Sequence, residues 1–505
     1  EYQMRHFGDT TLMRTGLHKN RESNLSSIVM CIVLLLSCVS SAIAAKPRVI
    51  VATDPIELDK NYQYVDEDIH PDDPETGDPD DLQSLVRFLL YANEFRIEGI
   101  IASSERIDDG KTKVWLNRDY TVQRVIDKYD EVDENLRLHD PAYPTADFLR
   151  SKVRKGFSCP EGSSLPGPGR DTPGSDLIIE VVDASSEILW FLDWVGQPQQ
   201  FELSQALWKV RQQRTPAETT EFLSKIRAIY TVVSREGPGG WLRDQFPTLF
   251  LVGPGYIIDK TIYSSRPFGG MGQYSMKGAD TSIWNTAWAD QHVRTGHGAL
   301  GSLLPTHKHH QKPILSDFDS RTFFQLLHQG LGDAADPTMG HWGGRYERVT
   351  GTNHWAPAQD DHPGSGHPSQ RIFYTVGRYQ QAMQAEFQAR MDWCVKDYAS
   401  ANHNPHAVLN GDASTKVMRL TVAPGTTVNL SAAGSRDPDG DSLRHTWWQY
   451  GEADSFEGSV HIRNSKSRDA SFAAPRADSE KNIHIVLEVS DNGRPNLTSY
   501  RRMVV

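Results

Sequence analysis

The sequence predicts an α/β domain, built on a mostly parallel sheet flanked by helices, followed by a C-terminal immunoglobulin-like β-sandwich. First, residues 47–54 form a short apolar run rich in β-branched residues, which is typical of a buried parallel strand. Second, apolar residues recur at helical spacing from Leu82 to Leu90, and a second strand-like run follows at residues 95–104. Third, from His406 onward short β-rich stretches alternate with turn residues, as in a sandwich.

The first strand, the helix and the second strand form one β-loop-α-β unit with acidic residues at one edge. Asp54 ends the first strand, and Asp80 and Asp81 follow Pro79 at the start of the helix. In open α/β sheets, ligands bind at the carboxyl ends of the strands. Converging carboxylates repel one another unless a cation compensates them, and Ca²⁺ tolerates irregular oxygen ligation better than Mg²⁺ does. The alternative, that Asp80 and Asp81 only stabilise the helix N-terminus, fits the residues equally well.

Residues 1–45 have the features of a signal peptide. Lys19 and Arg21 precede an apolar run at residues 28–36, and a small-residue cleavage site ends at Ala44. We therefore expect a secreted protein that is cleaved near Ala44. The remainder contains no stretch that is long and apolar enough to span a membrane.

The composition limits the class of partner. The formal charge of the 505-residue chain is −12, and residues 1–45 carry four basic and three acidic side chains, so residues 46–505 carry −13. This charge argues against binding to a nucleic-acid backbone and fits a neutral or cationic ligand. Only Cys159 and Cys394 lie outside the leader, so at most one disulfide is expected. The sequence leaves open whether the protein is a homo-oligomer.

Further elements are expected along the α/β domain, which we assign to residues 46–404. Helical patterns occupy residues 111–155 and 176–183, on either side of a loop rich in Gly, Pro and Ser at residues 158–175. Apolar runs predict buried strands at residues 188–196, 226–234 and 249–252. The sandwich, assigned to residues 405–505, has strand patterns at residues 428–431, 446–450 and 483–489.

Thr53-Asp54, together with the segment from Asp80 to Phe95, resembles the motif of a nucleoside-hydrolase-like family formerly labelled DUF1593. That family includes cellulose-binding proteins of the Sde182 type, and the resemblance covers nearly the whole chain after the leader. It implies that Asp54, Asp80 and Asp81 bind calcium and that Asp54 accepts a proton from the attacking water. In the family only a few residues separate the first acid from the pair. Here residues 55–78 intervene, either as a surface loop or as a gene-model artefact.

Later segments continue the resemblance. Asp319 aligns with a late aspartate that is a calcium ligand in nucleoside hydrolases, while Phe318 occupies the place of a histidine that assists the leaving base. The motif around Trp342 and Arg345 is close to the Gly-Trp-Gly-Gly-Arg-Tyr of the family, which suits sugar stacking and hydroxyl contacts. Local packing is an equal alternative for these two residues. An asparagine that follows a Trp-Gly-Gly motif in the family is missing, replaced by residues 197–200.

The resemblance implies a secreted, calcium-dependent hydrolase of glycosidic bonds that acts on a glycoside or an oligosaccharide. In this hypothesis Asp54, Asp80, Asp81 and Asp319 hold Ca²⁺, Asp54 is the catalytic proton acceptor, and Trp342 and Arg345 bind the substrate. The alternative is a carbohydrate-binding protein without catalysis, of the cellulose-binding kind. The missing histidine and asparagine favour that alternative.

Overall fold

The computed structural model describes residues 45–55, 79–104, 106–108, 113–115, 119–158, 165–194, 197–231, 237–253, 280–305, 308–309, 312–313, 315, 317, 319–361, 363–364, 366 and 368–505. The predicted leader up to residue 44 and the inserted segment at residues 56–78 lie outside these residues. Residues 46–505 form one compact unit. Of the helices in the described ranges, none combines the length and the apolar character that crossing a bilayer requires.

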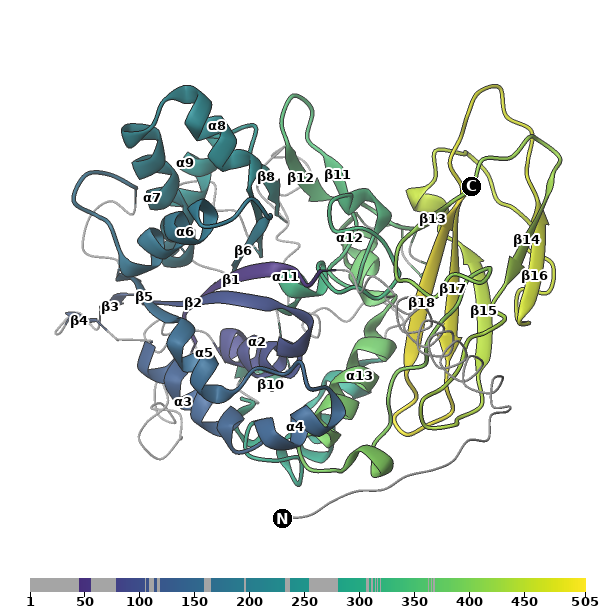
Figure 1. Ribbon diagram of the computed structural model, residues 1–505, viewed down its shortest axis with the longest axis horizontal. Helices are drawn as coiled ribbons and strands as arrows, with labels where there is room; N and C mark the ends of the chain where they lie inside the picture. Colours follow the sequence, from purple (N-terminus) through teal and green to yellow (C-terminus); the bar gives the residue numbers. More distant parts are fainter. Residues whose placement is uncertain are drawn as a thin grey trace, which may run out of the picture. The chain divides into compact units, whose positions relative to one another are not determined.

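An eight-stranded sheet forms the centre of the α/β domain (Figure 1). Its order is β11-β12-β8-β7-β6-β1-β2-β5, and every neighbouring pair is parallel except β11 and β12. The strands are β1 (Arg48–Thr53), β2 (Arg96–Ser104), β5 (Val153–Ser158), β6 (Leu189–Asp193), β7 (Ile226–Tyr230), β8 (Phe250–Val252), β11 (Tyr346–Arg348) and β12 (His354–Pro357). Because the chain continues from β1 to β2 and β5 on one side and later adds β6 on the other, the topological switch point lies between β1 and β6.

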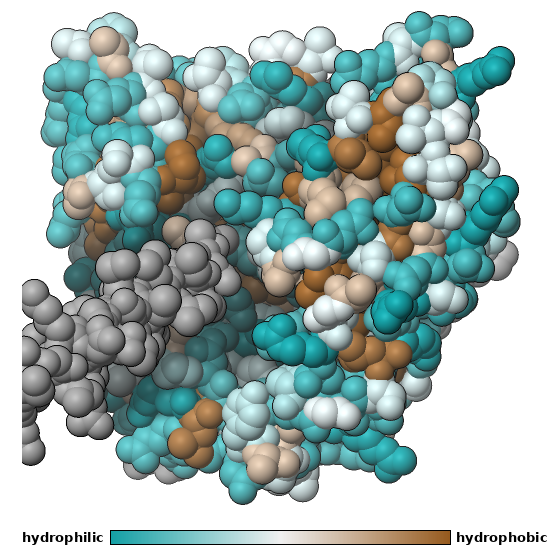
Figure 2. Space-filling view, turned by 45° about the vertical axis from the view of Figure 1, so that its right-hand side comes forward, coloured by the Kyte–Doolittle hydropathy of each residue, from teal (hydrophilic) through white to brown (hydrophobic). Residues whose placement is uncertain are grey.

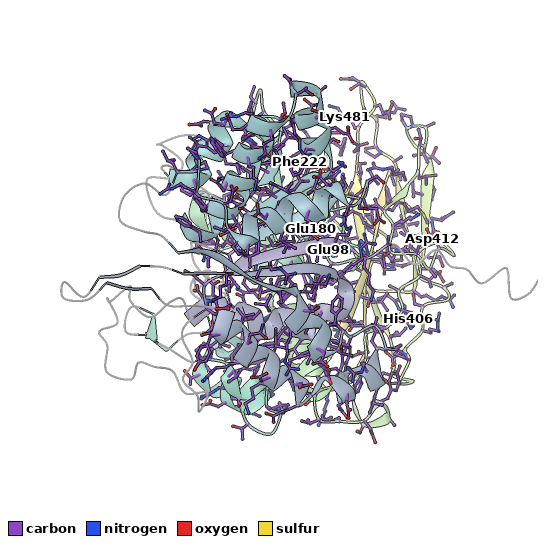
Figure 3. The ribbon with its side chains drawn as sticks, turned by 60° about the vertical axis from the view of Figure 1, so that its left-hand side comes forward. Glu98, Glu180, Phe222, His406, Asp412 and Lys481 are labelled. Atoms are coloured by element: carbon purple, nitrogen blue, oxygen red, sulfur yellow. The ribbon has the colours of Figure 1, made fainter. Side chains whose placement is uncertain are left out.

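Helices cover both faces of this sheet (Figure 1). Val49 and Val51 pack into one apolar cluster and Ile50 and Ala52 into another, as expected for a strand buried on both faces. The first cluster includes residues of α2 (Pro79–Leu90), α3 (Asp119–Asp130), α4 (Asp133–His139) and α5 (Ala146–Lys152). The second includes residues of α6 (Pro173–Asp183), α7 (Gln197–Gln213), α8 (Pro216–Ser224) and α9 (Gly237–Gln245). Figure 3 labels Phe222 of α8, which is buried in the second cluster.

Most predicted elements of the α/β domain are confirmed, with shifted ends. The strands expected at residues 47–54, 188–196, 226–234 and 249–252 correspond to β1, β6, β7 and β8. Helix α6 begins earlier than predicted because Thr172 caps it through a capping box with Ser175. The helical interpretation of residues 111–155 is wrong at both ends. There β4 (Lys113–Trp115) pairs with β3 (Arg106–Asp108), and the edge strand β5 begins at Val153.

Shorter elements complete this domain. They are η2 (Ala92–Glu94), η3 (Thr281–Trp284), α10 (Thr286–Ala289), the π-helical turn η4 (Asp290–Arg294), η5 (Gly301–Leu303), β9 (Lys308–His309), β10 (Lys312–Pro313), α11 (Ser320–Phe324), η6 (Pro337–Met339), α12 (Pro368–Gly377), α13 (Gln380–Asp392) and η7 (Tyr398–Ser400). The helix α13 packs against α2, so its buried residues extend the first apolar cluster.

The C-terminal residues form the predicted β-sandwich. One sheet has the order β13-β18-β17-β15, and β14 pairs with β16 in the other. The elements are β13 (Met418–Arg419), β14 (Thr427–Ser431), β15 (Arg444–Gln449), η8 (Gly451–Ala453), β16 (Asp469–Ala473), β17 (His484–Ser490) and β18 (Thr498–Val504). A third apolar cluster, which includes Trp447 and Phe472, fills the space between the sheets. Figure 2, which turns the sandwich side of the molecule forward, shows brown apolar residues in separate patches among teal ones.

The sandwich shares buried contacts with the α/β domain. The carboxylate of Asp360 is fully buried and accepts hydrogen bonds from Arg345 Nε and from the hydroxyl of Tyr450, each at 2.7 Å. Arg502 of β18 donates to the carbonyl oxygen of Met339. Tyr450 also belongs to the apolar cluster on the α2 face of the sheet. The two folds therefore pack as one unit, and the boundary at residues 404 and 405 stays a prediction.

Candidate functional site

Three buried carboxylates meet at the carboxyl edge of the sheet. Asp80 and Asp81 lie in the first turn of α2, and Asp319 precedes the first residue of α11. Each of the three offers an oxygen atom, and these oxygens lie within 4.8 Å of one another. Within the described ranges, no other group of His, Cys, Asp and Glu side chains meets this criterion. We call Asp80, Asp81 and Asp319 the carboxylate cluster.

Asp81 joins helix α2 to the end of β1. Its Oδ1 atom accepts a hydrogen bond from the Thr53 hydroxyl and another, at 3.0 Å, from the backbone N–H of Asp54. Asp81 has no exposed surface. These contacts fix the first turn of α2 at the carboxyl end of β1, beside the switch point.

Helix α2 also fixes the segment that carries Asp319. The Gln83 side-chain oxygen accepts from the backbone N–H of Asp317 at 2.8 Å, and Ser84 Oγ accepts from the backbone N–H of Asp319 at 3.1 Å. Arg87, one turn farther along α2, forms a buried ion pair with Asp317, with 2.5 Å between Nε and Oδ2. Asp317 has a φ of 45°, a left-handed conformation that needs such support in a residue with a side chain. A single helix therefore supplies two carboxylates and positions the third.

A fourth carboxyl group at this edge was not predicted. Asp193 ends β6, pairs in register with Ala52 of β1, and is fully buried. Burial raises the pKa of Asp193 well above its ordinary value, the charge of Asp319 raises it further, and a hydrogen bond from Gln200 opposes the change. Burial beside Asp319 therefore disfavours the charged form of Asp193. The sequence offered one clue, an acid inside an apolar strand run.

The carboxylate cluster fits a hard divalent cation. All of its donors are oxygens, and three acidic groups are gathered in a buried space. Ca²⁺ is held in proteins by six to eight oxygen ligands in flexible geometry, and an uncompensated set of this kind is electrostatically unfavourable. By the chemistry of the donors, Asp80, Asp81 and Asp319 could hold a hard divalent cation, and calcium stays a prediction.

Asp54 is placed beside the cluster rather than within it. Its carboxylate accepts a hydrogen bond from the side-chain amide of Gln199 on α7, and the side chain is almost fully buried. Its backbone N–H contacts Asp81. The roles of Asp54 as calcium ligand and as proton acceptor remain predictions.

Trp342 and Arg345 have structural partners in this structure. Trp342 has no exposed surface, and its ring packs edge-to-face on Phe324 and Tyr500, with centroids 5.5 and 6.4 Å away. Arg345 donates to Asp360 and, at 2.7 Å, to the carbonyl oxygen of Gln359. These contacts correspond to the local-packing alternative, and they give the predicted role in sugar binding no support.

Two protein-family models match the chain, one in the α/β domain and one in the sandwich. Residues 69–346 match the family model described as "Cellulose-binding Sde182, nucleoside hydrolase-like domain", which is more than half of the chain. The chain belongs to the Sde182 family. Residues 427–505 match a second model, "Cellulose-binding protein Sde0182, C-terminal domain". The first match begins after Asp54, so it does not include that residue.

A solved protein of similar structure supports this assignment. It is a nucleoside hydrolase-related hypothetical protein from Saccharophagus degradans, described as associated with carbohydrate metabolism. It is 32% identical, the alignment covers 91% of this chain and 99% of that one, and the TM-score is 0.69. Mouse clustered PcdhgC3 EC1-3 also matches, at 24% identity over 22% of this chain and 34% of that one, but its TM-score of 0.14 carries no argument. No curated protein matches the chain.

A buried glutamate of α7 joins neighbouring elements in this Sde182-family domain. The carboxylate of Glu202 accepts from the backbone N–H of Phe157 and, at 2.5 Å, from the Thr172 hydroxyl. A Cβ atom on Gly174 would lie 2.6 Å from Glu202, so the glycine permits this approach. Burial raises the pKa of Glu202 to about 7, and the hydrogen bonds from Thr172, Phe157 and Ser175 oppose the rise.

This pKa predicts a loss of stability as the pH rises. An unfolded glutamate has a pKa of about 4.3, so between about pH 4.3 and 7 the unfolded chain releases a proton that folded Glu202 keeps. The free energy of unfolding should therefore fall by about 4 kcal/mol through Glu202 over this range. This loss should be absent in Glu202→Gln. Urea unfolding should therefore show that the free energy of unfolding of the variant rises relative to that of the wild type between pH 4 and 8. An unchanged difference between the two proteins at all pH values would contradict the assignment.

Proposed function

We propose that this protein is a secreted, calcium-dependent hydrolase of glycosidic bonds that acts on a glycoside or an oligosaccharide. The observation that carries the proposal is the convergence of Asp80, Asp81 and Asp319 at the carboxyl edge of a nucleoside-hydrolase-like sheet. This edge is where ligands bind in open α/β folds. The description of the similar S. degradans protein as associated with carbohydrate metabolism supports a sugar-containing substrate.

In this mechanism the carboxylate cluster holds the cation and Asp54 moves the proton. Bound Ca²⁺ would supply a fixed positive charge that orients a water molecule and lowers its pKa. Asp54 accepts one proton from the attacking water as the oxygen of that water bonds to the anomeric carbon. The glycosidic C–O bond breaks through an oxocarbenium-like transition state, the leaving oxygen takes a proton from solvent, and Asp54 returns its own proton to solvent. The Gln199 amide, which donates to the Asp54 carboxylate, favours the ionised form that this role needs.

A second candidate function is carbohydrate binding without catalysis. The family models that match residues 69–346 and 427–505 are both described as cellulose-binding. In the part of the chain that the structure describes, Trp342 and Arg345 are engaged in packing and ion pairing rather than open to a substrate. Product formation separates the two candidates, because binding alone releases no sugar.

Calcium should control both activity and stability. The purified protein would be incubated with nucleosides and with plant or fungal oligosaccharides, in Ca²⁺ and in chelator, and released sugar would be measured. We expect release that the chelator abolishes. Since a ligand present at 100 times its Kd stabilises the folded state by about 2.7 kcal/mol, saturating Ca²⁺ should also raise the Tm, and Asp319→Asn should lose this rise.

The opposite results would have clear meanings. Sugar release that is equal in Ca²⁺ and in chelator would overturn the calcium-dependent mechanism. Absence of release with every substrate, together with retention on cellulose, would support the carbohydrate-binding alternative.

A further inference from the structure

Two histidines connect the α/β domain to the sandwich. His139 ends α4, and His403 lies between η7 and the sandwich. Their rings meet through His139 Nδ1 and His403 Nε2, which are 2.9 Å apart. The other nitrogen of His403, Nδ1, lies 3.0 Å from a carboxylate oxygen of Asp439 in the loop between β14 and β15. The other nitrogen of His139, Nε2, lies 2.9 Å from the carbonyl oxygen of Lys396. We call these four residues the histidine row.

The histidine row has three contacts, and both of its ends are hydrogen-bond acceptors. A carbonyl oxygen and an ionised carboxylate accept hydrogen bonds and donate none, so both outer ring nitrogens need a proton. Because a neutral imidazole carries only one proton, the two inner nitrogens are then bare, with their lone pairs facing each other across 2.9 Å. Whether the missing proton sits on a ring or on Asp439, three contacts need three protons. Two neutral rings supply only two.

The geometry between the two rings fits a proton and not a metal ion. The ring centroids are 5.1 Å apart, and the ring planes differ by 30°. Because this separation exceeds the distance between the nitrogens by about the two ring radii, each ring points its nitrogen almost directly at the other. A zinc ion needs about 2.0–2.1 Å to each nitrogen, so it does not fit on the line between them. An N–H···N hydrogen bond does fit at 2.9 Å.

Aromatic rings beside the row favour a positive charge on it. Trp393 lies nearly parallel to both imidazoles, with its centroid 5.3 Å from that of His139 and 5.2 Å from that of His403. Tyr398 stacks on His403 with 3.9 Å between centroids. The faces of Trp and Tyr rings attract a cation within about 6 Å. Asp439 also accepts from the backbone N–H of His403 at 2.7 Å, so its carboxylate is held in position to compensate the charge.

The other charged groups around the row have partners of their own. These pairs are Lys396 with Asp392, Arg390 with Glu386 and Glu94, Asp140 with Asn93, Asp397 with the backbone N–H of Ser400, and Asp437 with the backbone N–H of Asp439. His328 lines the same cavity as His139, and burial lowers the pKa of His328. These pairings leave a charge on the row to be balanced by Asp439.

The row is suited to one extra proton and not to two. Burial lowers the pKa of His139, the hydrogen bond with the carbonyl group of Lys396 opposes this change, and a charge on His403 lowers the pKa further. Coupled groups of this kind take up protons in separate macroscopic steps. The first proton completes three hydrogen bonds, whereas a second would place two positively charged rings side by side.

We propose that His139 and His403 share one proton, and that this proton closes a pH-sensitive link between α4 and Asp439 of the sandwich. As the pH rises and the row loses the proton, one of its three contacts has no hydrogen and opens. The sandwich loop around Asp439 is then held less tightly to the α/β domain. This inference goes beyond the proposed function and does not depend on hydrolysis, because the row contains no residue of the carboxylate cluster.

The test is long-range ¹H–¹⁵N NMR of the full chain with ¹⁵N-labelled histidine, titrated from pH 8 to pH 5. These spectra distinguish a protonated ring nitrogen from a bare one. We expect the signals of His139 and His403, assigned by substitution with alanine, to shift together as the two rings take up one proton. His139→Asn is the matched variant, because its amide can donate to His403 Nε2 without an extra proton. In this variant, His403 should keep a single proton, on Nδ1, over the whole range.

Amide hydrogen exchange measures whether the proton tightens the link. The backbone N–H groups of His403, Asp439 and Asp441 all donate to carboxylates at this junction. After correction for the intrinsic effect of pH, their protection in the wild type should be at least about fivefold greater at pH 6 than at pH 8. It should be equal at both pH values in His139→Asn. His461→Ala, at an exposed histidine of the sandwich, should behave like the wild type.

Three results in the wild type would overturn the proposal. They are independent titration of the two rings, two bare inner nitrogens at every pH down to 5, and equal protection at pH 6 and pH 8. Because each is read from the wild type, each remains decisive even if a variant fails to fold.

Discussion

Replacing Asp81 with asparagine should reduce calcium-dependent sugar release by at least ~100-fold, which corresponds to about 3 kcal/mol of lost transition-state stabilisation. The substitution removes one charge from the carboxylate cluster. An asparagine oxygen can still accept from Thr53 and from the Asp54 backbone, so the helix should stay joined to β1. Initial rates at saturating Ca²⁺ would measure the effect, and Tm would show that the fold is intact.

A matched control uses an exposed aspartate of the same domain. Asp147 is 93% exposed and pairs with surface Arg150, so Asp147→Asn should change neither sugar release nor the response to Ca²⁺. Wild-type rates in Asp81→Asn would exclude the carboxylate cluster from catalysis. Equal losses in both variants would show that a general change of surface charge causes the effect.

Replacing Arg87 with methionine should destabilise the protein by about 3–5 kcal/mol, the usual cost of removing one partner of a buried ion pair. Arg87 is 1% exposed and Asp317 is 3% exposed, so the carboxylate would keep its charge without its main counter-charge. Arg87 also donates to Gln384 at 2.7 Å and lies 3.9 Å above the Phe387 ring. Methionine retains most of the apolar contact, so urea unfolding would report mainly the electrostatic loss.

Two further variants isolate that loss. Asp317→Asn combined with Arg87→Met should recover part of the stability, because the double variant leaves no unpaired charge. Arg150→Met, at an exposed network with Asp127, Asp130 and Asp147, should cost about 1 kcal/mol or less. Equal losses for Arg87→Met and Arg150→Met would show that the buried pair has no special role.

The sequence predicted those parts of the fold that are marked by local apolar patterns. The β1-α2-β2 unit was predicted because its strands are short continuous apolar runs and its helix repeats apolar residues at helical spacing. Strand β5 was missed for the opposite reason. It is an edge strand with Arg154 and Lys155 at its centre, and polar edge residues resemble a helical surface when only the sequence is available.

The candidate site was predicted in part. Asp80, Asp81 and Asp319 carry motifs, and the structure brings them together. Asp193 was missed because its importance comes from β6 lying beside β1, a pairing that no local pattern reveals. Local sequence also does not show whether Trp342 faces a ligand or a neighbouring domain. Its partner Tyr500 comes from the last strand, so the contact depends on the tertiary fold.

The contact between β18 and the loop before Trp342 has a consequence for synthesis on the ribosome. Arg502 donates to the carbonyl oxygen of Gly340 across 162 residues of sequence. At about 5–20 residues per second, translation needs roughly 10–30 s to cover that interval. During this time the nascent α/β domain lacks Tyr500 and Arg502, and the surface around Trp342 that they later cover is open to chaperones, proteases or other chains.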